Sequence, residues 1–111
     1  HESPVNSLSY NKSNPNIFIS GSWDGTAKVW DLSSKKCLYT LKDHSYAVTV
    51  CSLTENKFIT ASNDLRIRIW NKDQNVKNID NAHELIIRDI KSKDNSEFYT
   101  CSNDQTIKLW N

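Results

Sequence analysis

The chain has 111 residues, a formal net charge of +1 and 37% hydrophobic residues, which suits one small folded unit. This balance of charge argues against binding to nucleic acid, because such binding favours an excess of basic side chains. No apolar run approaches the roughly 20 residues that span a bilayer, so we expect no membrane insertion.

The first third of the chain reads as four short strands separated by turns. Residues 5–10 (VNSLSY) alternate apolar and polar side chains, as a half-buried strand does. Residues 16–20 and 27–30 do the same around the turn SWDG, and residues 37–41 follow the turn DLSSKK. The pattern returns at residues 47–53, 57–62, 66–70, 75–79, 86–92, 97–102 and 107–110. No stretch has a helical period.

An internal repeat of about 40 residues organises these strands. Three segments align: SGSWDGTAKVWD (20–31), TASNDLRIRIWN (60–71) and TCSNDQTIKLWN (100–111). Each contains an aspartate and, six positions later, a tryptophan, and each follows a histidine by about half a period. We therefore expect three units, at about residues 1–43, 44–82 and 83–111.

These motifs resemble the WD-repeat family over essentially the whole chain. The resemblance implies an all-β fold of three four-stranded antiparallel blades of a β-propeller, an incomplete ring whose third blade lacks its last strand. Some positions depart from the family pattern. No glycine precedes His44 or His83, Asn71 and Asn111 replace the final aspartate, and LR (65–66) replaces the usual turn residues. We expect the fold to tolerate these changes.

The resemblance also implies a hydrogen-bonded tetrad in each blade. The tetrads are His1, Ser20, Asp24 and Trp30; His44, Thr60, Asp64 and Trp70; and His83, Thr100, Asp104 and Trp110. The hydroxyl is the least secure member, because Ser22, Ser62 and Ser102 lie nearby. A Ser-His-Asp set could instead be catalytic. However, three near-identical copies without a nucleophile elbow or an oxyanion hole favour a structural role, so we expect no enzyme activity.

The three cysteines, Cys37, Cys51 and Cys101, form no C-x-x-C pair. Each lies in an apolar, strand-like stretch, and we expect reduced, buried side chains in an intracellular protein. The expected location is the cytoplasm, with the nucleus as an additional one. Histidine and cysteine never come together at ligand spacing, and with only two glycines there is no phosphate-binding loop. We therefore expect no metal and no cofactor.

A finer resemblance concerns the stretches SGSWDGTAKVW, ENKFITAS and CSND. Together they are similar to central blades of the phospholipase A2-activating protein family. That family is a ubiquitin-binding adaptor in ubiquitin-dependent degradation and ubiquitin recycling, and other parts of it dock on an AAA unfoldase. The resemblance implies a non-catalytic module that binds ubiquitin. Nothing in these residues supports a link to phospholipase chemistry. The alternative is a generic WD-repeat scaffold in another complex, such as signalling or ribosome assembly.

Propellers usually bind partners through their top face. Family geometry assigns to it the residues before each turn aspartate and those three and five positions after each histidine: Trp23, Asn63, Asn103, Pro4, Asn6, Ala47, Thr49, Ile86 and Arg88. Trp23 is the favoured partner anchor, and its alternative role is packing on a neighbouring loop. For Arg88 the alternative to a partner contact is a salt bridge at the strand edge.

Three blades cannot close a ring, which normally needs four to eight. The family resemblance favours the interpretation that these three blades are part of a seven-bladed propeller. The alternative is self-association through the open blade edges, since two copies would supply six blades.

Overall fold

The computed structural model describes every residue except 43, 45, 53 and 55, and at residues 51, 52 and 76 it describes the backbone alone. The described residues form eleven strands and no helix, so none of them forms a helix that could cross a membrane. The strands are β1 (Val5–Tyr10), β2 (Ile17–Ser22), β3 (Thr26–Asp31), β4 (Lys36–Lys42), β5 (Val48–Ser52), β6 (Lys57–Ser62), β7 (Ile67–Asn71), β8 (Gln74–Ile79), β9 (Ile87–Ser92), β10 (Phe98–Ser102) and β11 (Ile107–Trp110).

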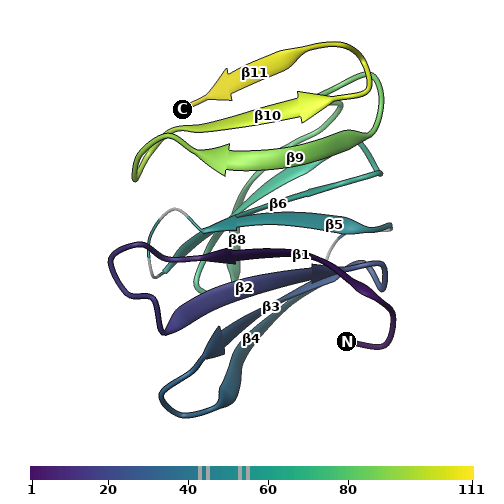
Figure 1. Cartoon of the computed structure of the whole chain (residues 1–111). Coiled ribbons are helices and arrows are strands. Elements are labelled where there is room, and N and C mark those ends of the chain that lie inside the picture. The colour runs from purple at the N-terminus through teal and green to yellow at the C-terminus, as the bar shows by residue number, and fades with distance from the viewer. Residues whose placement is uncertain (43, 45, 53, 55) are drawn as a thin grey trace.

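The strands form three separate antiparallel sheets, and the ring is not closed (Figure 1). The first sheet has the order β1-β2-β3-β4, the second β5-β6-β7-β8 and the third β9-β10-β11. The innermost strands β1, β5 and β9 lie side by side, so the sheets follow one another as blades do. This arrangement confirms the predicted fold class, including the missing fourth strand of the third sheet. Predicted strand ends lie within two residues of the observed ones, and three strands, β1, β6 and β11, match at both ends.

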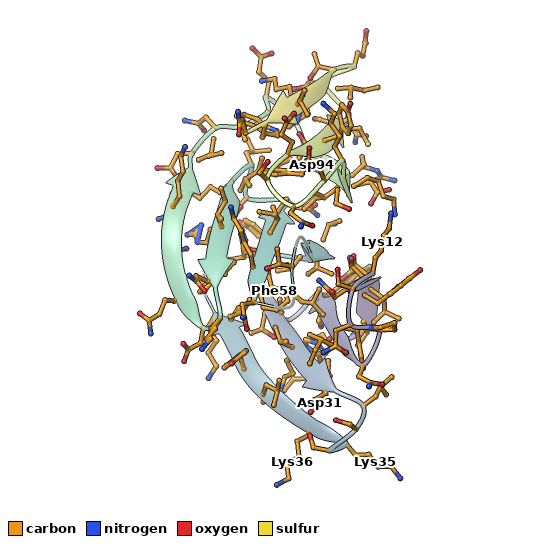
Figure 2. All side chains as sticks on the ribbon, turned by 90° about the vertical axis from the view of Figure 1, so that its left-hand side faces the viewer. Lys12, Asp31, Lys35, Lys36, Phe58 and Asp94 are labelled. Carbon is orange, nitrogen blue, oxygen red and sulfur yellow. The ribbon has the colours of Figure 1, made fainter. Side chains whose placement is uncertain are left out.

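Two apolar cores hold the sheets together. The first core, between the first and second sheets, buries Ile19, Val29, Val48 and Phe58, and Phe58 lies in the middle of the molecule (Figure 2). The second core joins the second and third sheets: Ile59, Ala61, Ile67, Ile69, Ala82, Ile87, Ile90 and Phe98. Side chains of a strand alternate between two faces, so each sheet supplies one face to each neighbouring core.

Gly21 sets the distance between the first two sheets. A Cβ atom added there would lie 2.3 Å from the carbonyl oxygen of Val48 on β5. Only a residue without a side chain allows this approach of the two backbones.

The tight turns that precede β3, β7 and β11 share a positive φ angle. Gly25 has φ 83°, Leu65 69° and Gln105 73°. Glycine adopts this left-handed region without strain, whereas leucine and glutamine do so at a cost of about 1–2 kcal/mol. The second turn therefore tolerates the replacement noted at Leu65 at this cost, and the third turn has the same cost at Gln105.

The cysteine prediction was wrong for Cys37 and only partly right for Cys101. Cys37 is exposed, because β4 is the outermost strand of the first sheet. Cys101 is half-buried, because its face of the third sheet is not covered by another sheet. Both are free thiols, and the side chain of Cys51 lies outside the described residues.

Candidate functional site

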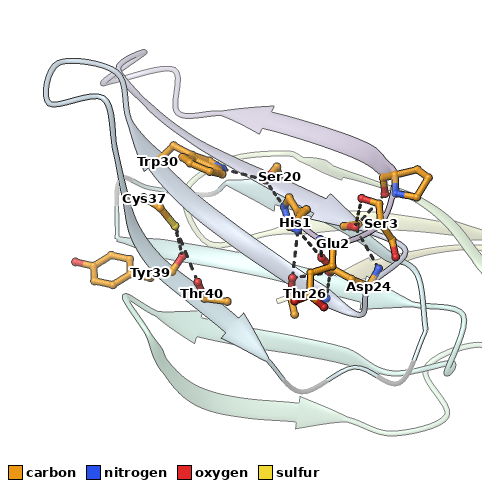
Figure 3. Close-up of polar contacts among 12 residues, drawn as sticks. His1, Glu2, Ser3, Ser20, Asp24, Thr26, Trp30, Cys37, Tyr39 and Thr40 are labelled. Atoms are coloured by element: carbon orange, nitrogen blue, oxygen red, sulfur yellow. Dashed lines mark hydrogen bonds and ion pairs between the residues drawn. The ribbon is translucent and has the colours of Figure 1, made fainter.

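The first tetrad forms a continuous chain of hydrogen bonds (Figure 3). The Nδ1 atom of His1 lies 3.0 Å from Oδ2 of Asp24, and its Nε2 lies 2.8 Å from Oγ of Ser20. The indole Nε1–H of Trp30 donates to the same Oγ over 2.9 Å. The imidazole comes from the segment before β1, the hydroxyl from β2 and the indole from β3, so the network ties the entering segment to two strands.

The other two sheets repeat this geometry. Nδ1 of His44 lies 2.9 Å from Asp64 Oδ2, and Nδ1 of His83 lies 2.9 Å from Asp104 Oδ2. The hydroxyls of Thr60 and Thr100 lie 2.8 and 2.7 Å from the respective Nε2 atoms and accept from the indoles of Trp70 and Trp110 at 2.9 and 2.8 Å. The structure therefore brings together all twelve tetrad residues named from the sequence.

The donor and acceptor directions in each tetrad follow from its two end groups, the indole and the carboxylate. An indole N–H only donates and a carboxylate only accepts, so the imidazole donates from Nδ1 and the hydroxyl donates to Nε2. The hydroxyl thus uses both its proton and a lone pair, and the three imidazoles are almost completely buried. This arrangement satisfies buried polar groups, whereas a nucleophile needs a free, accessible oxygen.

The turn geometry keeps two of the aspartates ionised. At Asp104 the hydroxyl of Thr106 is the largest influence, and with the backbone N–H of Glu84 it holds the pKa of the carboxyl well below its usual range. At Asp24 burial acts to raise the pKa, but hydrogen bonds from Thr26 and from the N–H of Glu2 outweigh it and lower the pKa. An ionised carboxylate is the better acceptor for the imidazole N–H.

The other serines near the tetrads in the sequence, Ser22, Ser62 and Ser102, form different hydrogen bonds. The hydroxyl of Ser22 donates to the carbonyl of Pro4 over 2.9 Å, and Ser62 and Ser102 donate likewise to Tyr46 and Leu85. Each of these hydroxyls also accepts the backbone N–H of the turn aspartate. They therefore fix the loops of the top face and lie outside the tetrads.

A recurring backbone bond joins the predicted top-face residues in pairs. The N–H of Trp23 donates to the carbonyl of Pro4, Asn63 donates to Ala47, and Asn103 donates to Ile86, at 3.1, 3.3 and 3.0 Å. Each bond connects a turn tip with the loop that enters the same sheet. These bonds join the predicted top-face residues in three loop pairs, one for each sheet.

A pocket of about 540 Å³ opens on this face between the three sheets. It is lined by Asn6, Trp23, Tyr46, Ala47, Thr49, Asn63, Ile86, Ile87 and Arg88. Seven of these residues were named from the sequence, whereas Pro4 and Asn103 do not line the pocket. Tyr46 and Ile87 were missed. The signal for Tyr46 was available, since it is an aromatic residue two positions after a tetrad histidine, and it is exposed.

Trp23 and Arg88 are both accessible in this pocket. Trp23 is 63% exposed as a residue, so packing on a neighbouring loop covers only a minor part of it. Arg88 is exposed on β9, and no described residue forms an ion pair with it. Among the described residues no three His, Cys, Asp or Glu side chains converge as metal ligands. The pocket therefore offers aromatic, aliphatic and guanidinium contacts.

Comparison with known proteins finds the same repeat in many relatives. The family described as "WD domain, G-beta repeat" matches residues 1–31, 35–71 and 74–111. Cell division control protein 4 of Saccharomyces cerevisiae is 44% identical over 57 residues, which are 50% of this chain and 7% of that protein. Mitochondrial division protein 1 of Schizosaccharomyces pombe is 34% identical over 85 residues, 76% of this chain and 13% of that protein.

A homologue of the ribosome biogenesis protein WDR12 from Trichoplax adhaerens is 30% identical over 93 residues, 77% of this chain and 22% of that protein. The chain thus spans less than a quarter of the length of each of these three relatives.

Solved structures agree on the fold. The crystal structure of the WD40 β-propeller domain of Doa1 has a TM-score of 0.88 and 38% identity over 98% of this chain, which corresponds to 36% of that domain. The structure of U3-55K has a TM-score of 0.89 at 21% identity, covers 99% of this chain and 35% of its own, and shows the fold alone. WD40 propellers are generally non-catalytic interaction scaffolds, and the matches indicate no enzyme family. With the family pattern matched in all three units, the chain belongs to the WD40 (WD domain, G-beta repeat) family.

Proposed function

We propose that this WD40 module binds ubiquitin through the top-face pocket. The observation that carries the proposal is Trp23, a large indole that remains 63% exposed at the rim of a 540 Å³ pocket whose lining includes Tyr46 and Ile86. Exposed aromatic side chains beside a concave surface are favoured anchors for protein partners. The sequence resemblance to the phospholipase A2-activating protein family supports ubiquitin as the partner.

Two exposed carboxylates in the loops that enter the first and third sheets support the same partner, although Arg88 is the charged residue that lines the pocket itself. Ubiquitin presents a small apolar patch with a rim of basic residues. Glu2 and Glu84 are exposed, and they lie in the same two loops as Pro4 and Ile86. Carboxylates near an apolar surface complement a basic rim and speed association. Arg88 is then available to donate hydrogen bonds to backbone carbonyls of the partner.

A titration of isotope-labelled ubiquitin with the chain, followed by NMR, tests the proposal. We expect saturable shifts that cluster on the apolar patch of ubiquitin. Trp23→Ala should weaken binding about 10-fold or more, because an anchor of this kind contributes at least about 1–2 kcal/mol. Leu38→Ala is the matched control: Leu38 is also exposed but lies on β4, outside the pocket, and should leave the affinity unchanged.

The competing function is a scaffold for a different protein complex. It is favoured by the diversity of the relatives, which are named for cell division, mitochondrial division and ribosome biogenesis. The absence of any ubiquitin shift with a folded chain would reject the ubiquitin proposal and favour this scaffold. An unchanged affinity for Trp23→Ala would remove Trp23 from the binding site.

A further inference from the structure

The two junctions between neighbouring sheets are built from equivalent positions, so they can be compared residue by residue. At the junction of the first and second sheets, the partly buried side chains of Ile17 and Tyr39 pack against the first core. By strand register, Ile17 on β2 corresponds to Lys57 on β6. Tyr39 on β4 corresponds in the same way to Lys77 on β8. The junction of the second and third sheets therefore has two lysines where the first junction has two side chains that complete its packing.

A hollow of about 280 Å³ lies beside these two lysines. The apolar part of its lining is Ile59, Ile69 and Phe98, which belong to the second core and are at most 8% exposed. The charged side chains in its lining are both lysines, Lys57 and Lys77, and no described residue forms an ion pair with either of them. The hollow thus combines an apolar floor with two available ammonium groups.

The hollow lies between two sheets that the structure describes, so its floor does not depend on any further sheet. Asn111 is at its edge, and Asn71 is the equivalent residue of the second sheet. After Asn71 the chain turns through Lys72 and Asp73, which are exposed, into β8, whose described side chains lie outside the first core. A strand in the corresponding place after Asn111 would therefore leave the hollow open.

The first junction shows which side chain fits this place. Tyr39 packs there against the core, whereas the equivalent Lys77 is exposed at the hollow. An aromatic ring supplied from outside would take the place that Tyr39 fills and would be removed from water by the isoleucine and phenylalanine side chains. Carboxylates beside that ring would complement the two ammonium groups. We propose that the hollow binds an acidic peptide segment of a partner protein, which inserts one aromatic side chain between the second and third sheets.

This site is separate from the top-face pocket. Lys57 and Phe98 are the first residues of β6 and β10, whereas the turn tips Asn63 and Asn103 directly follow the last residues of the same two strands. The two sites share no lining residue. The peptide proposal therefore does not rest on the ubiquitin proposal.

Fluorescence anisotropy of a labelled peptide with the whole chain tests the proposal. The probe is a peptide in which one tyrosine has two aspartates on each side. It should bind saturably, and more weakly as the salt concentration rises, because the ammonium groups are accessible to solvent. Peptides with alanine in place of the tyrosine, or with lysines in place of the aspartates, should bind at least about 10-fold more weakly. Equal binding of either peptide, or no binding of the probe to the folded chain, would overturn the proposal.

Two substitutions of Lys77 sharpen the test. Lys77→Tyr restores the side chain of the first junction, so it should fill the hollow and weaken probe binding about 10-fold or more. Lys77→Glu reverses the charge at the same place and should weaken binding at least as much. Lys36→Glu is the matched control, because Lys36 is exposed on the outermost strand β4 and does not line the hollow. It should leave the affinity unchanged.

Circular dichroism checks that each of the three variants is folded. Unchanged probe affinity in either Lys77 variant would overturn the proposal. An equal loss of affinity in Lys36→Glu would also overturn it, because the probe would then respond to the overall charge of the chain and not to the hollow.

Discussion

The tetrads and the turn tips lie next to each other in the sequence but differ in how closely they repeat. The imidazole-to-carboxylate distances are 3.0, 2.9 and 2.9 Å in the three sheets, and the chemical roles are the same in each. The residues just before the aspartates are Trp23, Asn63 and Asn103, and only the first is apolar. The tetrad residues, which repeat in every sheet, support the fold. The residues at the turn tips vary from sheet to sheet and are available to recognise a partner.

The largest effect should follow from removing a tetrad imidazole. His83→Ala leaves the Asp104 carboxylate and the Thr100 hydroxyl without their partner and opens a buried space. We expect a loss of about 3 kcal/mol in the free energy of unfolding, measured by urea denaturation. Glu84→Ala, one residue away and exposed, is the control and should change little. A stable, fully folded His83→Ala protein would contradict the structural role.

A smaller loss should follow from removing one hydroxyl. Thr60→Val is nearly isosteric but leaves the indole N–H of Trp70 and Nε2 of His44 without a partner. We expect a loss of about 2 kcal/mol in unfolding free energy. Thr60→Ser should restore most of it, because Ser20 performs the same role in the first sheet. Equal stability of the valine and serine variants would show that the hydroxyl is dispensable.

A pH-dependent effect should follow from Thr106→Val. The Thr106 hydroxyl lowers the pKa of Asp104, so its stabilising contribution is present above the unfolded pKa of about 4 and is lost as the pH falls towards the folded value. The variant should be less stable than the wild type at pH 7, and the difference should shrink below pH 4, as urea midpoints at several pH values would show. A difference that is constant with pH would contradict this mechanism.

The smallest effect on stability should follow from Trp23→Ala. The indole is mostly exposed, so the unfolding free energy should change by no more than about 0.5 kcal/mol. Thermal denaturation measures this directly. A large destabilisation would mean that Trp23 packs as part of the fold. The distinction between exposed turn tips and structural tetrads would then not hold for the first sheet.

Periodicity made most of the fold predictable from the sequence. A period of 40 residues marks equivalent positions and local alternation marks the strands, so the sheets could be named in advance. The residues joined by the tetrad hydrogen bonds were named from the resemblance to the WD-repeat family. Exposure could not be predicted in the same way. Cys101 was expected to be buried, and it is only half-buried because no sheet covers its face. The lining residue Ile87, at the start of β9, depends on how the sheets meet in space, which a repeat alignment does not encode, whereas Tyr46 could have been named from its position two residues after His44.

The four indole groups of the molecule give it a built-in set of spectroscopic labels. Trp30, Trp70 and Trp110 each hold their ring proton in a hydrogen bond to a tetrad hydroxyl, whereas no described residue accepts the ring proton of Trp23. In deuterated water three indole signals should therefore persist, one for each sheet, while the fourth exchanges at once. The order in which the three disappear would show which sheet opens first.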